Sequence, residues 1–183
     1  MLQRKYLFPH VIEMNYQAGR RLGVNVYLID GGSAWALIDV GYEETVPEVI
    51  DLIRAMDFSL AKCKLVIATH ADADHVQGLR KAKELLKAKV AAHPLAVGPL
   101  EEGDEVLTFA VIKAQNIHLP MPPCKVDVRL DEGDVVQVGG DREELRRRVG
   151  ERVARQRRQG HRGHAGPVTP QQRLEEQEGV AAG

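Results

Sequence analysis

The stretch from Thr69 to Leu79, THADADHVQGL, places two histidines and two aspartates within six consecutive residues. Imidazole nitrogens and carboxylate oxygens are ligands that Zn²⁺, Fe²⁺ and Mn²⁺ accept. Two such ions about 3.5–4 Å apart can share a water and prepare it for attack on a carbonyl or phosphoryl centre. The segment therefore predicts a site for one or two divalent cations. The candidate ligands are His70, Asp72, Asp74 and His75.

A purely structural role must be weighed against this interpretation. Acidic residues before a helix can cap it and interact favourably with its dipole. Capping does not account for His70 at the end of a buried strand together with His75. Such a strand presents His70 at the carboxyl edge of a sheet, where α/β folds commonly build their sites. We therefore favour a metal site, with His70 and Asp72 at one ion and Asp74 and His75 at its neighbour.

Apolar patterns predict the elements that position this segment. Strands are indicated by short apolar runs, and helices by apolar residues at helical spacing. The predicted strands cover residues 24–29, 34–40, 64–70, 89–93, 125–130 and 135–138. The predicted helices cover residues 44–56 and 75–89. Turn residues at 30–33 and 131–134 indicate two hairpins, and a proline- and glycine-rich connection precedes the last pair of strands. The succession predicts an α/β (α+β) fold.

The composition changes sharply near Gly139 and Gly140. Residues 141–183 contain ten arginines, no lysine and no aromatic residue. This segment fits a solvated, poorly ordered extension, or a shifted reading frame, since out-of-frame GC-rich DNA yields Arg, Gly, Ala and Pro. A nucleic-acid-binding arm is disfavoured because seven acidic residues lower its positive charge. We predict a folded portion over residues 1–140 and an exposed, disordered or frame-shifted tail over residues 141–183.

Global composition narrows the class of protein. The chain has 183 residues and a net charge of −1, so its overall charge indicates no nucleic-acid or other charged partner. Cys63 and Cys124 lie far apart, without a partner that would indicate a disulfide framework or a nucleophile. The N-terminus lacks the apolar region of a secretory signal, and no apolar run is long enough to cross a membrane. We expect a soluble, cytoplasmic protein that acts on a small-molecule substrate.

The segment THADADH resembles the T-H-x-H-x-D-H signature of the metallo-β-lactamase-fold superfamily, hydrolases that include glyoxalase II-like thioesterases, lactonases and nucleases. The resemblance extends to ALIDVG, which matches the family's LIDxG-type stretch about thirty residues earlier and ends a predicted strand at Asp39. It covers residues 22–140, the first half of an αββα sandwich. It implies that His70 binds the first metal, and Asp74 and His75 the second. Asp74 would also orient the nucleophilic water or take its proton. Asp39 would not bind the metal itself but would hold the metal-binding histidines in position.

The chain departs from the family signature in two places. Asp72 replaces the second histidine; a carboxylate still binds metal but favours iron or manganese somewhat relative to zinc, which remains the expected ion. The family's later ligands, from a TPGH loop, a GD turn and a last histidine, have no counterpart at matching places. His161 and His164 lie roughly where the first of these loops would fall, but without its Thr-Pro-Gly, so we assign them no role.

Two functions follow from this pattern. The first is a metal-dependent hydrolase that uses a metal-activated water on an ester, thioester, lactone, amide or phosphodiester. The second is a truncated or degenerate family member without turnover, which binds metal weakly or acts as an interaction module. Whether the later ligands exist, either in the gene of this chain or in a partner subunit, distinguishes the two functions. Half a sandwich also leaves one sheet face uncovered, and a homodimer would cover it.

Overall fold

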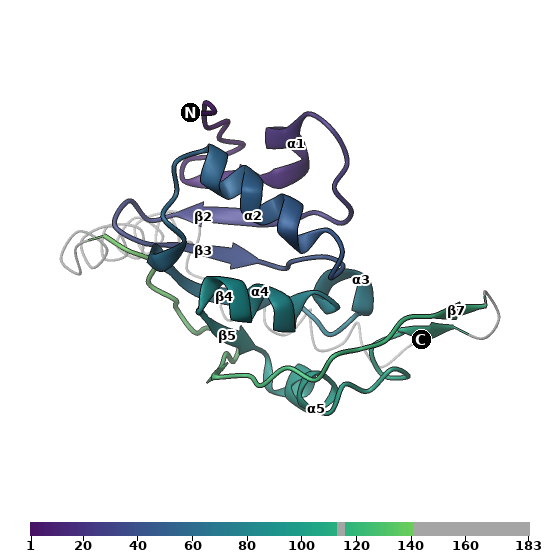
Figure 1. The fold of residues 1–183 in the computed structure, drawn as a ribbon. Coiled ribbons are helices and arrows are strands. Elements are labelled where there is room, and N and C mark those ends of the chain that lie inside the picture. The colour runs from purple at the N-terminus through teal and green to yellow at the C-terminus, as the bar shows by residue number, and fades with distance from the viewer. Residues whose placement is uncertain (113–115, 141–183) are drawn as a thin grey trace, which may run out of the picture. The chain divides into compact units, whose positions relative to one another are not determined.

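A six-stranded mixed sheet organises the chain in a computed structural model that describes residues 1–112 and 116–140 (Figure 1). The strand order is β1-β2-β3-β4-β5-β8, in which β1, β2 and β3 are antiparallel neighbours and β3, β4, β5 and β8 are parallel. The strands are β1 (Val11–Glu13), β2 (Tyr27–Asp30), β3 (Trp35–Ile38), β4 (Cys63–Ala68), β5 (Lys89–Ala92) and β8 (Val128–Arg129). The predictions for residues 141–183, including His161 and His164, lie outside the described residues.

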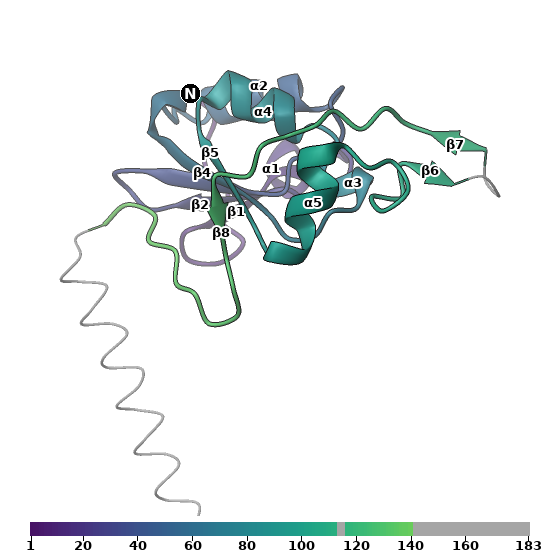
Figure 2. The ribbon, with the colours of Figure 1, turned by 90° about the horizontal axis from the view of Figure 1, so that it is seen from below.

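Helices pack on one face of this sheet, and Figure 2 shows α2 and α4 side by side there. The α-helices of the described residues are α1 (Met14–Ala18), α2 (Val46–Ala55), α3 (Ala73–Val76), α4 (Leu79–Leu86) and α5 (Pro94–Glu102), with a short 3-10 helix, η1, at Leu60–Lys62. Their apolar side chains form one continuous core with the sheet, centred on buried residues such as Ile53, Val66 and Leu79. This arrangement confirms the predicted α/β (α+β) class.

The opposite face of the sheet is covered more thinly. Its buried residues are small or few, namely Ala36, Leu65 and Ala91. Partly buried side chains from the segment after β8, including Val136 and Val138, pack against them. Within residues 1–112 and 116–140, the main helical core therefore lies on one side of the sheet, and the segment after β8 packs on the other side.

The elements that lead into the predicted site agree with the sequence patterns. β2 and β3 form the expected hairpin, in which Asp30 is opposite Trp35 and the Gly31 N–H donates to the Ala34 carbonyl at 2.9 Å. Gly32 has φ +75°, a conformation that glycine adopts without the usual steric cost. β4 is the predicted buried strand, and it ends at Ala68, just before the histidine–aspartate segment.

The single helix predicted over residues 75–89 is wrong, because the structure divides this stretch into α3 and α4. The break occurs at Gly78, whose N–H donates to the Gly41 carbonyl at 2.9 Å. A Cβ atom on Gly78 would lie 2.5 Å from Val46 Cγ2 and 3.0 Å from the Tyr42 carbonyl carbon. This close approach to a distant loop has no signal in local periodicity. In addition, α3 begins at Ala73, earlier than predicted.

Two further predictions fail in the second half of the sheet. The second hairpin is wrong: a turn forms, with the Asp134 N–H donating to the Asp131 carbonyl at 3.1 Å, but residues 135–138 form no strand and pack by their side chains. The proline- and glycine-rich connection contains α5 and a ribbon of β6 (Val111–Ile112) and β7 (Ile117–His118). Pro94 and Gly103 mark the two ends of α5 and do not interrupt it.

No helix within residues 1–112 and 116–140 has the length and apolar character needed to cross a membrane.

The close approach at Gly78 gives a test of how α3 and α4 are joined. We expect Gly78→Ala to lower the free energy of unfolding by about 1–3 kcal/mol, because its Cβ overpacks against Val46 and the Tyr42 backbone. Gly98→Ala is the matched control, since Gly98 lies within α5, a Cβ atom added there would have no neighbour within 4 Å, and helical alanine is favoured by about 0.5–1 kcal/mol. Urea unfolding measures both. Equal stability of the two variants would contradict the packing argument.

Candidate metal centre

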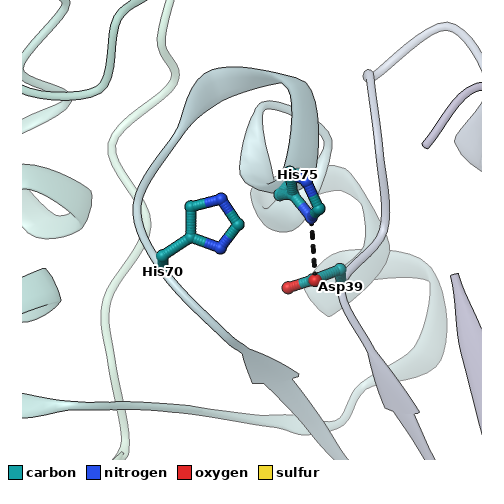
Figure 3. Close-up of side chains that lie close together, drawn as sticks. All are labelled: Asp39, His70 and His75. Atoms are coloured by element: carbon teal, nitrogen blue, oxygen red, sulfur yellow. Dashed lines mark hydrogen bonds and ion pairs between the residues drawn. The ribbon is translucent and has the colours of Figure 1, made fainter. Parts of the chain in front are cut away.

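Two parallel strands deliver the central residues of the site to the same edge of the sheet. β3 and β4 are paired, with Ile38 opposite Ile67, so their carboxyl ends lie together. Asp39 follows β3, and Thr69 and His70 follow β4. The loop then turns into α3, which brings His75 back over Asp39 (Figure 3).

Asp39 is the most deeply buried polar residue of this group, with 3% of its surface exposed. Its Oδ1 accepts a hydrogen bond from the Thr69 backbone N–H at 2.9 Å, and its Oδ2 accepts one from the Thr69 hydroxyl at 2.8 Å. The same Oδ2 lies 2.9 Å from Nδ1 of His75. Both oxygens of Asp39 are therefore engaged by neighbouring residues of the chain.

These contacts determine which ring nitrogens carry protons. A carboxylate only accepts, so His75 must donate from Nδ1 to Asp39. The Thr69 hydroxyl gives its one proton to Asp39, so His70 must donate from Nδ1 to Thr69 Oγ1, 2.8 Å away. In its neutral form, each ring then keeps the lone pair on Nε2, the atom that a metal would bind. One buried carboxylate thus sets both tautomers, directly and through a hydroxyl.

The two aspartates of the segment lie beside the Nε2 atoms. Oδ2 of Asp72 is 3.6 Å from Nε2 of His70, and Oδ2 of Asp74 is 3.8 Å from Nε2 of His75. The two imidazole rings lie beside each other (Figure 3). Their centroids are 4.2 Å apart and their planes are tilted by 53°. The loop therefore presents two neighbouring pairs, each of one nitrogen and one carboxylate oxygen.

Within the described residues, one group of three or more His, Cys, Asp or Glu side chains offers ligand atoms all within 4.8 Å of one another: Asp39, His70 and His75. Asp72 and Asp74 lie outside this tightest group, each next to its own histidine. Their side chains are 44% and 46% exposed, so both can reach a solvent-borne ion.

Helix capping does not explain the side chain of Asp72. Asp72 occupies the N-cap position of α3 with an extended backbone, but its side chain makes no capping hydrogen bond. Its backbone carbonyl does accept from the N–H groups of His75 and Val76, at 2.9 and 3.2 Å. The backbone of Asp72 starts the helix, and the carboxylate remains available beside His70.

Thr69 and the loop after Asp39 complete the site, and sequence reasoning assigned them no role. Thr69 connects Asp39 to His70 by hydrogen bonds. In the sequence, the only indication of this role was the position of Thr69 within the segment THADADH. The backbone N–H groups of Val40 and Gly41 both donate to the His75 carbonyl at 3.0 Å. These bonds hold α3 against the end of β3, and only the folded chain shows them.

The cysteines and the remaining described histidines have other surroundings. Burial raises the pKa of the Cys63 thiol to about 12 and that of Cys124 to about 11, so neither is a thiolate near neutral pH. Nδ1 of His10 lies 3.1 Å from the Asp30 carbonyl oxygen, Nδ1 of His93 accepts the Leu95 N–H at the start of α5, and His118 lies 3.1 Å from a carboxylate oxygen of Glu105. These contacts account for all three rings without a metal.

The role of Asp39 is testable by changing its hydrogen bonds while keeping its shape. In Asp39→Asn, an amide replaces one acceptor oxygen, so it no longer fixes both histidine tautomers. We expect metal affinity to fall about 10–100-fold, measured by competition with a chelator, and the ¹⁵N signals of His75 to show a changed tautomer. Asp57→Asn is the control, since Asp57 also has a positive φ of 64° but lies away from the site. Unchanged affinity in Asp39→Asn would contradict the assigned role.

The chain is similar to a known protein family and to several solved structures. A family model described as the metallo-beta-lactamase superfamily matches residues 19–165, and so extends beyond Gly140. A HARLDQ-motif mutant of the metallo-beta-lactamase from Cronobacter sakazakii shares 25% identity at a TM-score of 0.60, covering 76% of this chain and 52% of that chain. BJP-1, a subclass B3 metallo-beta-lactamase of Bradyrhizobium japonicum, shares 25% at a TM-score of 0.58, covering 76% and 47%.

A third solved structure, the MIM-2 metallo-beta-lactamase, shares 27% identity at a TM-score of 0.55, covering 64% of this chain and 43% of that chain. The chain thus spans about half the length of these solved relatives. The matches confirm the resemblance and the fold predicted from THADADH and ALIDVG. Since the family model covers most of its residues, the chain belongs to the metallo-beta-lactamase superfamily.

Proposed function

We propose that the chain is a metal-dependent hydrolase whose metal centre is the loop from His70 to His75. The observation that carries the proposal is the pair of facing nitrogen–oxygen sets, His70 with Asp72 and His75 with Asp74. The substrate would be an ester, thioester, lactone, amide or phosphodiester, each with an electrophilic carbonyl or phosphoryl centre. The similarity to proteins named metallo-beta-lactamases adds a β-lactam amide to the substrates worth testing.

The residues present fit a divalent cation. Hydrogen bonds from the two Nδ1 atoms leave both Nε2 lone pairs for a metal. Within the described residues, the side chains of Asp72 and Asp74 accept no hydrogen bond, so their oxygens are not committed elsewhere. A bound cation would polarise a carbonyl or phosphoryl oxygen and lower the pKa of water.

The chain's own residues would supply positioning and proton transfer. Asp39 holds the His75 ring directly and the His70 ring through Thr69, so neither ring has to reorient during a reaction. Asp74 has a carboxylate that is 46% exposed and lies beside His75, in reach of a water at the loop. We assign Asp74 the role of orienting that water and receiving its proton on a carboxylate oxygen.

Zinc is the expected ion, and Asp72 makes the site more tolerant of harder ions. Each of the two positions offers one imidazole and one carboxylate, where a histidine at position 72 would make the set richer in nitrogen. Carboxylate ligands suit manganese and iron better than imidazole does.

A second function, metal binding without turnover, is supported by one observation. Within the described residues, all candidate ligands come from Asp39 and the single loop from His70 to His75. The solved relatives are about twice as long as the matched part of this chain. Ligands beyond this loop would have to come from elsewhere for the site to surround its ions.

The two functions are separated by measuring binding and turnover on the same protein. We expect the full chain to bind one or two zinc ions by calorimetry, and to hydrolyse at least one of a thioester, a lactone, a phosphodiester and a chromogenic β-lactam. His70→Ala and His75→Ala should abolish both properties. Binding without hydrolysis would establish the second function. Absence of zinc binding would overturn both.

Metal preference provides a separate prediction for Asp72. We expect Asp72→His to raise the ratio of zinc to manganese affinity roughly tenfold, about 1.4 kcal/mol, because imidazole replaces a hard oxygen ligand. Competition titrations with zinc, and electron paramagnetic resonance of bound manganese, measure the two affinities. Asp51→His, on the exposed side of α2, is the control and should leave the ratio unchanged. A ratio that stays unchanged or falls in Asp72→His would contradict the assignment of Asp72 as a ligand.

A further inference from the structure

A groove of about 540 Å³ lies next to the loop that carries the candidate ligands. One wall comes from the segment after Asp39, with Tyr42, Glu43 and Glu44. The other walls come from Gln77 and Lys81, at and after the end of α3, and from Leu119 after β7. None of the roles assigned above involves the groove, so the function of its lining residues is a separate question.

The groove is fixed by contacts on both sides. Gln77 is buried, and its Oε1 accepts the Glu43 N–H at 2.6 Å while its Nε2 donates to the Pro120 carbonyl at 3.0 Å. A single side chain therefore joins the two walls. The Thr45 hydroxyl and N–H both contact the Tyr42 carbonyl, at 2.9 and 3.1 Å, which stabilises the turn on the other wall. A ligand would find these walls already in place.

The groove adjoins the candidate metal centre through Tyr42. Gly41, the residue before Tyr42, donates its N–H to the carbonyl of His75, so the groove wall rests on α3. Burial raises the pKa of Tyr42, and the nearby charges of Asp74 and Glu44 raise it further. The carboxylates of Asp74 and Glu44 are thus both near the Tyr42 side chain, which stays a neutral phenol.

The charges along the groove are unequal. Lys81 lies 4.0 Å from Glu43, and in an adjoining hollow of about 430 Å³ Arg80 pairs with Glu84 at 3.1 Å. Among the described residues, Glu44 has no ion-pair partner, and its side chain is exposed at the groove. The one uncompensated charge of the lining is therefore negative, beside the aromatic ring of Tyr42.

We propose that this groove binds the part of the substrate remote from the reacting bond, and that this part carries an apolar body and a cationic amino group. Leu119 and the ring of Tyr42 supply apolar contact, and the ring face also attracts a cation. Glu44 supplies the opposite charge. The assignment rests on the proposed function, since it makes the groove an extension of the hydrolytic site.

Binding to the metal-free chain tests the groove without requiring turnover. The full chain in chelator is titrated with 2-phenylethylammonium and, separately, with 3-phenylpropionate, which has a similar apolar body and the opposite charge. We expect the ammonium compound to shift the amide signals of residues 42–44, 77 and 119 and to bind about fivefold more tightly than the carboxylate. Equal affinity of the two compounds, or shifts confined to other residues, would overturn the proposal.

Variants of the lining give the second arm of the experiment. Tyr42→Ala and Glu44→Gln should each weaken ammonium binding about threefold or more. Tyr42→Phe should keep ammonium binding, because the aromatic ring remains. If Tyr42→Ala is unfolded in thermal melts, Tyr42→Phe and Glu44→Gln remain as the tests of the lining. Glu102→Gln, at an exposed position in α5, should change nothing. Loss of binding in Tyr42→Phe, or none in Glu44→Gln, counts against the proposal.

The two proposals fail in different ways. Ammonium binding without hydrolysis of any substrate would support the groove and count against the hydrolase. Hydrolysis without selective ammonium binding would support the hydrolase and overturn the groove.

Discussion

The carboxylate of Asp39 is the constraint on which the rest of the site depends. It is buried at the end of β3, where its backbone has φ +58°, a left-handed conformation that costs most residues about 1–2 kcal/mol. Aspartate tolerates that conformation better than most residues do. In this conformation, the two carboxylate oxygens of Asp39 accept three hydrogen bonds from Thr69 and His75. One residue therefore joins the ends of two strands to the first turn of α3.

The backbone around Gly41 forms a second connection between the same elements. The N–H groups of Val40 and Gly41 donate to the His75 carbonyl, and the Gly41 carbonyl accepts from Gly78. Tyr42 follows immediately, so its position in the groove is set by the bonds that also hold His75. The metal loop and the groove consequently share one scaffold, and movement of α3 would disturb both.

The sequence predicted the parts of this arrangement that depend on local pattern. The predicted strand ending at His70 placed this residue at the carboxyl edge of the sheet, and the β2–β3 hairpin followed from its turn residues. Asp39 was connected to the histidines by the family resemblance, and the parallel pairing of β3 with β4 was not predicted. The break at Gly78 was not predictable, because it arises from contact with Tyr42, far away in the chain. Residues 135–138 have the alternation of a strand but pack by side chains alone. The bridge from Asp39 through the Thr69 hydroxyl to His70 depends on side-chain rotamers, which the sequence pattern does not determine.

The hydrogen bonds that hold the His70–His75 loop come mostly from a short part of the chain. Within the described residues, the bonds to the two histidine side chains come from Asp39 and Thr69, and Gly78 closes the same unit. One further bond, from the Ala73 N–H to the Thr108 carbonyl at 2.7 Å, joins the loop to the segment after α5. A site held by residues that precede Gly140 can present its nitrogen and oxygen atoms to an ion whatever follows Gly140. Catalysis requires more than metal binding, because the substrate must also be bound in a fixed orientation and water must be excluded around it. The proposed metal binding and the proposed catalysis are therefore separable, and the hydrogen bonds of the loop bear on the first of them alone.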